Sequence, residues 1–192
     1  MNYGLHIFDT AIGPCGIAWG PRGVTAVSFP ERDVAKTQAR LQQKCPQAKP
    51  ADPPQEIRSA IADIVALLKG ERRDLAHIAV DDSAIPEFNR RVYALARTIP
   101  PGQTKSYGEI AKALGDRLLA RDVGQALGQN PIPIVIPCHR VLAASGKTGG
   151  FSAPGGVNTK LRVLSIERAQ PGGPTLFDDL PLAVRGRTSH RA

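Results

Sequence analysis

The first thirty residues alternate short apolar runs with turns rich in glycine and proline, which is the pattern of β-hairpins. This pattern predicts three strands, over residues 5–8, 15–19 and 24–29. Beyond them, apolar side chains recur at intervals of three and four residues, the spacing of an amphipathic helix. Helices are therefore predicted over residues 34–44, 57–68 and 88–96, and the proline-rich segment 45–54 is predicted to be a loop.

A further apolar run, residues 76–80, predicts one more strand. The acidic, turn-prone residues 81–83 and Pro86 follow it and mark a boundary. We therefore expect an N-terminal α/β domain over residues 1–82 and a mainly α-helical C-terminal domain over residues 83–169. Residues 170–192 have little apolar periodicity and are expected to form a mobile tail.

Two short helices are predicted in the middle of the second domain. Ser106 and Glu109 have the spacing of a capping box, in which each side chain satisfies a free N–H group of the other residue. The helix they begin can end at Gly115, and a second helix follows over about residues 119–128. Two helices joined by a tight turn are a helix-turn-helix candidate, although an antiparallel pair without a ligand has the same pattern.

The composition is that of an ordinary globular protein. Of the 192 residues, 42% are hydrophobic and 22% charged, which excludes wholesale disorder. No segment approaches the ~18 uninterrupted apolar residues of a membrane span, and residues 1–11 lack the pattern of a signal peptide. Three cysteines are too few for a disulfide framework and indicate a reducing compartment. We therefore expect a cytoplasmic protein without a membrane partner.

The net charge of +8 is concentrated in the second domain. Residues 1–85 hold ten basic and ten acidic residues, whereas residues 86–170 hold 12 basic and five acidic ones, a net of +7. This asymmetry suggests that the second domain contacts a polyanion. A solvated basic surface with no specific partner would give the same charge balance.

The most informative segment is residues 130–141, an apolar run interrupted by three prolines. Such a run cannot be a helix, and it places Cys138 at a rigid turn. A neighbouring imidazole or cation lowers the pKa of a thiol and so activates it, and His139 and Arg140 follow directly. The alternative is a buried, inert cysteine, which is the commoner fate of this residue type.

These residues resemble the O6-alkylguanine-DNA alkyltransferases, also called methylated-DNA–protein-cysteine methyltransferases. The run Pro137-Cys138-His139-Arg140-Val141 is similar to the active-site pentapeptide of that family. Other matching blocks keep the order and spacing of the family: Ile99-Pro100, Ser106-Tyr107-Gly108, Ala120-Arg121, Val123-Gly124, Asn130-Pro131, Gly149-Gly150-Phe151-Ser152, Gly155-Gly156, Lys160, Leu164 and Glu167. The resemblance covers roughly residues 1–168, and several ordered blocks around one cysteine are a strong signal.

The resemblance implies a single-turnover repair enzyme that moves an alkyl group from O6 of guanine to its own cysteine. Cys138 would be the acceptor. His139 would act as a base through a water molecule, oriented by Glu167 at the end of a helix predicted over residues 159–167. Tyr107 would give a proton to the departing guanine.

The remaining site residues are also implied by the resemblance. Arg121 would fill the base stack after the damaged nucleotide flips out, on a helix that enters the minor groove. Asn130 would hold the backbone between that helix and the cysteine turn. The alkyl pocket and other contacts with DNA or substrate would come from Pro133, Phe151, Ser152, Ser106 and Arg140.

The family fold is a ribonuclease-H-like α/β domain followed by a domain with a winged helix-turn-helix. The expected partner is double-stranded DNA that contains O6-alkylguanine, with O4-alkylthymine as a further lesion, and the expected state is a monomer. No cofactor is implied, because the DNA is the donor and the protein the acceptor. His6, Cys15, Cys45 and His77 lack paired ligand spacing, so no metal is predicted.

Three features depart from the family pattern and bear on substrate range. Asp122 follows Arg121 where a small apolar residue is usual, and it either orients the arginine or weakens DNA binding. Phe151 stands where a tyrosine is common, and the loop after it contains Ala153-Pro154. Two other functions stay open: a non-catalytic sensor of alkylated bases, which the intact Cys138-His139 pair disfavours, and an unrelated cysteine hydrolase.

Overall fold

The computed structural model describes residues 3–169, and the predicted mobile tail lies outside this range. Its first half contains a four-stranded sheet in the order β3-β2-β1-β4. The strands β1 (Gly4–Phe8), β2 (Cys15–Gly20) and β3 (Gly23–Ser28) pair antiparallel and confirm the three predicted strands. The two-residue strand β4 (Lys49–Pro50) pairs parallel to β1 within the segment that was predicted to be a loop.

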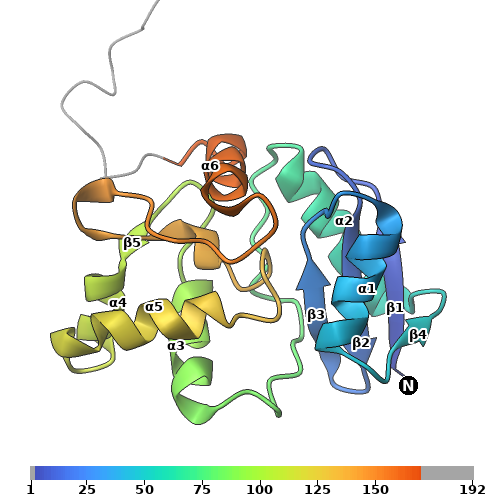
Figure 1. Cartoon of the computed structure of the whole chain (residues 1–192), viewed down its shortest axis with the longest axis horizontal. Coiled ribbons are helices and arrows are strands. Elements are labelled where there is room, and N and C mark those ends of the chain that lie inside the picture. Colours follow the sequence, from blue (N-terminus) through green and yellow to red (C-terminus); the bar gives the residue numbers. More distant parts are fainter. Residues whose placement is uncertain (1–2, 170–192) are drawn as a thin grey trace, which may run out of the picture.

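Helices cover both faces of this sheet (Figure 1). The helix α1 (Val34–Lys44) packs on the face to which Leu5, Ala18 and Ala26 point. The helix α2 (Gln55–Leu68) belongs to a second core with Ile17 and other residues of the opposite face. Both helices lie where they were predicted, since alternate residues of a strand point to opposite faces and each face needs an apolar cover.

The strand predicted over residues 76–80 is wrong. Ile78 N donates to Leu75 O, which closes a turn, and Ala76 and His77 are exposed. Leu75 and Ile78 are buried, so the apolar positions serve a turn rather than a strand. Only the end of the run meets the sheet, through an isolated bridge between Val80 and Val24.

The second half is mainly helical and lies beside the sheet (Figure 1). The capping box of Ser106 and Glu109 is confirmed, and Gly115 follows its helix with φ of 108°, a conformation that glycine adopts readily. The last helix starts earlier than predicted, at Gly156. The elements are α3 (Glu87–Arg97), β5 (Lys105–Ser106), α4 (Tyr107–Ala113), α5 (Ala120–Gly128), β6 (Val141–Leu142) and α6 (Gly156–Ile166), with single 3₁₀ turns at Arg117–Leu119, Cys138–Arg140 and Ala144–Gly146.

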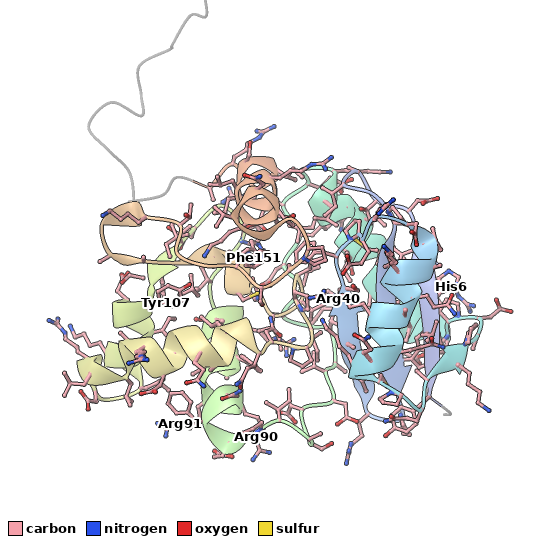
Figure 2. All side chains as sticks on the ribbon, in the orientation of Figure 1. His6, Arg40, Arg90, Arg91, Tyr107 and Phe151 are labelled. Carbon is pink, nitrogen blue, oxygen red and sulfur yellow. The ribbon has the colours of Figure 1, made fainter. Side chains whose placement is uncertain are left out.

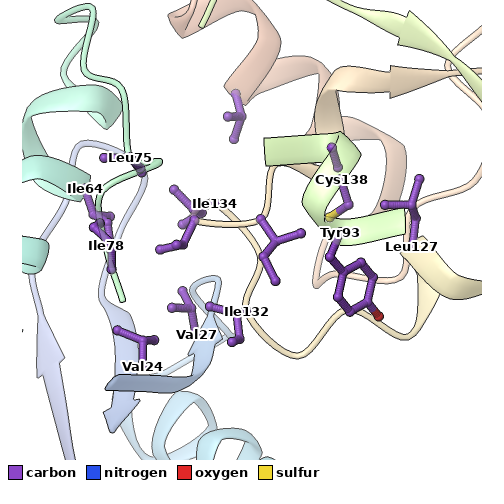
Figure 3. Packing of buried hydrophobic residues seen from close by; sticks show 14 of the residues in the cluster. Val24, Val27, Ile64, Leu75, Ile78, Tyr93, Leu127, Ile132, Ile134 and Cys138 are labelled. Carbon is purple, nitrogen blue, oxygen red and sulfur yellow. The ribbon is translucent and has the colours of Figure 1, made fainter. Parts of the chain in front are cut away.

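The two halves share one hydrophobic core (Figure 3). Residues 131–137 lie against β3, where Val27 N donates to Pro131 O over 3.0 Å. Ile132 and Ile134 are fully buried there. Ile134 has φ of 76°, a left-handed conformation that is costly for a β-branched side chain. The segment that carries the cysteine is therefore held by packing against the first half of the chain.

Among residues 3–169, every helix is too short or too polar to span a lipid bilayer.

Candidate active site

Cys138 begins the 3₁₀ turn Cys138–Arg140 and is only 7% exposed. The turn is fixed from behind by Asn130, whose Nδ2 donates to Ile136 O over 2.8 Å. Asn130 Oδ1 accepts from Ile132 N over 2.9 Å, so one side chain joins the end of α5 to the segment that leads to the cysteine. Because both bonds are buried, the thiol has a fixed position relative to α5.

Glu167 lies directly after α6 and reaches back to the cysteine turn. Its Oε1 lies 3.0 Å from His139 Nε2, and its two oxygens also accept from the Arg140 guanidinium over 2.7 and 2.9 Å. The third guanidinium nitrogen, Arg140 Nη1, donates to Ile99 O over 2.6 Å. All three side chains are almost completely buried, although the sequence pattern alone is that of a surface helix acid for Glu167.

This network fixes the protonation of His139. Burial lowers the pKa of His139 and outweighs the opposing effect of Glu167, so the imidazole is neutral near pH 7. Burial alone would raise the pKa of Glu167, but the hydrogen bonds from His139 and Arg140 and the positive charge of Arg140 lower it to about 2. A neutral His139 must donate from Nε2 to this carboxylate, which puts the basic lone pair on Nδ1. Nδ1 is buried and has no hydrogen-bond partner among residues 3–169.

Burial raises the pKa of Cys138, so the resting residue is a neutral thiol. Four contributions act against burial and favour the thiolate: the Asn130 side chain, the ammonium groups of Lys160 and Lys44, and a backbone N–H. Lys160 is fully buried, and its Nζ donates to Val141 O over 2.7 Å and to Thr148 O over 2.6 Å. The sequence did not predict Lys44 near the site. Lys44 belongs to α1 in the other half of the chain, and only the folded structure brings it to the cavity beside Cys138.

A cleft of about 530 Å³ opens to Cys138 from the side of α4 and α5. Tyr107 and Arg121 line it, Tyr107 from the first position of α4 and Arg121 from the first turn of α5. Burial raises the pKa of Tyr107, which keeps its hydroxyl protonated. The loop that contains Gly149 approaches Tyr107 closely, and glycine permits this because a Cβ there would lie 3.1 Å from the Tyr107 hydroxyl oxygen.

A smaller cavity of about 190 Å³ meets Cys138 from the seam between the halves. Pro133, Phe151 and Ser152 line it from the second half, while Arg40 and Lys44 line it from α1. The Phe151 ring makes an edge contact with the Phe29 ring at 5.8 Å between centroids. Figure 2 shows Phe151 and Arg40 on the two sides of this seam.

Two predicted site residues have other contacts in this structure. Arg140 was assigned to DNA or substrate, but its guanidinium is buried on Glu167 and Ile99 and does not reach the surface. This prediction is wrong, because the ion pair with Glu167 uses the charge inside the protein. The Ser106 hydroxyl is engaged in the capping box with Glu109. Asp122 makes no ion pair with Arg121 in the described part of the chain.

The other two cysteines are buried and line neither the cleft nor the smaller cavity. Burial raises the pKa of Cys15 to about 12, which leaves its thiol protonated and unreactive. Among residues 3–169, no group of three or more His, Cys, Asp or Glu side chains is arranged to hold a metal ion.

The chain is similar to known proteins. Residues 87–169 match a family described as the DNA-binding domain of 6-O-methylguanine DNA methyltransferase. A methylated-DNA–protein-cysteine methyltransferase of Mycolicibacterium paratuberculosis is 44% identical over 127 residues, which are 65% of this chain and 74% of that protein. The protein of the same name from Methanothermobacter thermautotrophicus is 35% identical over 152 residues, covering 79% of this chain and 78% of its own.

The overall arrangement of the chain is also similar to a solved structure. A crystal structure of Mycobacterium tuberculosis OGT in complex with DNA superimposes with a TM-score of 0.68 at 33% identity. The superposition covers 86% of this chain and 92% of that one.

Proposed function

The chain belongs to the methylated-DNA–protein-cysteine methyltransferase family, and from that membership we propose that it repairs O6-alkylguanine in double-stranded DNA by direct transfer of the alkyl group to Cys138. The observation that carries this assignment is a buried thiol at the end of a cleft, directly before a neutral histidine that is oriented by a buried carboxylate. The S-alkyl thioether formed is a poor leaving group, so each molecule reacts once.

The proposed chemistry starts at the His139-Glu167 pair. His139 Nδ1 takes the Cys138 proton through a water molecule, and Glu167 stabilises the resulting imidazolium. Lys160 and Lys44 stabilise the thiolate, because their positive charges lower the pKa that burial raises. The thiolate then attacks the alkyl carbon, and the electron pair of the broken bond stays on O6 of guanine.

Tyr107 makes guanine a better leaving group, because its protonated hydroxyl donates a proton to the base in the cleft. The base must first leave the duplex, since O6 cannot reach a buried thiol inside the stack. Arg121 is exposed at the start of α5 and fills the stack in place of the flipped base.

We assign DNA binding to the second half of the chain, with α4 and α5 as the helix-turn-helix and the β5-β6 pair as part of its wing. The first half has the ribonuclease-H-like arrangement in this proposal, and the active unit is a monomer. The net charge of +7 over residues 86–170 supports this division, because phosphate neutralisation supplies most nonspecific affinity for DNA.

The intact mass of the protein tests the function. After incubation with a duplex containing one O6-methylguanine, the protein should gain one methyl group, mapped to Cys138. Cys138→Ala should gain none, and Cys15→Ala serves as the matched control that still reacts. Tight binding without a gain of mass would indicate a sensor instead, and turnover of an ester substrate would indicate a hydrolase.

A further inference from the structure

The cavity between the halves carries a positive charge that has no acidic partner. Lys44 Nζ donates to Val27 O over 2.8 Å and to Pro131 O over 3.2 Å. No Asp or Glu oxygen of the described residues pairs with it, whereas the neighbouring Arg40 is paired with Glu31 over 2.9 Å. A partly buried ammonium group held only by carbonyls is in a costly position, and an approaching anion would offset that cost.

This charge lies where the far end of an alkyl group would lie. The cavity touches Cys138 and also Pro133, Phe151 and Ser152, the residues assigned to the alkyl pocket. The larger cleft that receives the base, beside Tyr107 and Arg121, adjoins this cavity and shares Cys138, Phe151 and Ser152 with it. During in-line attack of Sγ on the carbon, a further substituent on that carbon lies to the side of the O6–C–Sγ line, and the adjoining cavity lined by Lys44 gives it room.

An alkyl group ending in a carboxylate has two obstacles at such a site. Its charge must leave water, and it must approach a second negative charge, the thiolate. A fixed cation on the opposite wall offsets both effects. Lys44 can do this near neutral pH, because burial lowers its pKa only to about 8 and most of the population stays protonated.

We propose that the Lys44 cavity is a subsite for O6-alkyl groups that end in an anion, such as carboxymethyl, and that Lys44 is its specificity-determining residue. This inference rests on the proposed function. In the reaction, the Cys138 proton passes to His139, Sγ bonds to the methylene carbon, and the bond from that carbon to O6 breaks. Its electrons stay on guanine O6, and the base receives a proton from Tyr107. The products are S-carboxymethylcysteine and unmodified guanine in DNA.

The test compares three duplexes that carry O6-methylguanine, O6-carboxymethylguanine or the neutral analogue O6-carbamoylmethylguanine. Single-turnover rates should be faster for carboxymethyl than for carbamoylmethyl in the wild type. In Lys44→Met this preference should fall by about tenfold, the effect of losing one hydrogen bond to a charged group. Lys44→Arg should restore much of it, and Lys36→Met, an exposed residue on the same helix, should leave it unchanged.

For each variant, the rates on the three duplexes are compared with one another. A ratio of two rates from the same variant does not depend on the fraction of the protein that folds. Equal losses on all three duplexes in Lys44→Met would overturn the subsite and leave Lys44 as a partner of the thiolate alone. A wild type that prefers the neutral analogue would overturn it as well. Failure of the wild type to accept methyl from O6-methylguanine would instead contradict the proposed function.

Discussion

Arg121 is an exposed arginine at the mouth of a cleft whose floor is the reacting thiol. This position assigns Arg121 to base flipping and not to alkyl transfer. Flipping a base out of a duplex costs a few kcal/mol, whereas a free base needs no flipping before the thiolate attacks. Arg121→Ala should therefore slow repair in duplex DNA at least about tenfold more than reaction with free O6-benzylguanine. Single-turnover kinetics with both substrates would measure this.

The control for Arg121 is Arg58→Ala, an exposed arginine on α2 and away from the cleft. It should leave both rates nearly unchanged. An equal loss on duplex and free base in Arg121→Ala would rule out the flipping role.

Glu167 makes stability depend on pH. Its pKa is lowered from 4.5 to about 2 in the folded protein, so its contribution is complete above pH 4.5 and is lost as the pH falls towards 2. Glu167→Gln should be less stable than the wild type at neutral pH by on the order of 3 kcal/mol, because the buried Arg140 loses its carboxylate. The difference should shrink as the pH falls from 5 to 2, measured by urea unfolding at each pH. Parallel curves over this range would contradict the role of the ion pair.

At the scale of elements, the capping box ties catalysis to helix stability. Ser106 Oγ accepts from Glu109 N over 3.1 Å and begins α4 directly before Tyr107. Ser106→Ala should cost about 1 kcal/mol of unfolding free energy. Chemical denaturation would measure this, with Ser165→Ala on the exposed face of α6 as the control that loses little or nothing. A loss in Ser165→Ala as large as in Ser106→Ala would count against the cap.

Elements with local signals were predictable, and contacts between distant segments were not. The capping box and glycine stop placed α4, and the pattern of apolar positions placed α1 and α5, within a residue or two, because these signals act over one or a few helical turns. The strand at residues 76–80 failed because an apolar run also fits a turn that buries Leu75 and Ile78. The burial of Glu167 and the approach of Lys44 to Cys138 depend on packing between segments far apart in the sequence.

At the scale of the whole molecule, the two halves should unfold together. The larger of the two clusters of buried side chains spans both halves, and in it Ile132 and Ile134 of the second half pack with Val24 and Val27 of the first (Figure 3). Separating the halves would expose this apolar surface, so neither has a complete core of its own. Trp19, the only tryptophan, reports on the sheet, while circular dichroism reports mostly on the helices.

Thermal unfolding followed by both signals should give coincident curves with one midpoint. Two separate midpoints would show that the predicted domains, residues 1–82 and 83–169, are independent folding units.

The left-handed conformation of Ile134 restricts which substitutions this part of the protein can accept during evolution. Glycine there would relax the backbone by about 1–2 kcal/mol, but removing a fully buried isoleucine side chain costs about 2–5 kcal/mol. No single replacement of Ile134 therefore relaxes the backbone and also keeps the buried side-chain contacts. A viable exchange needs a simultaneous enlargement of a neighbour on β3, such as Val27, so the two positions should vary as a pair and seldom one at a time.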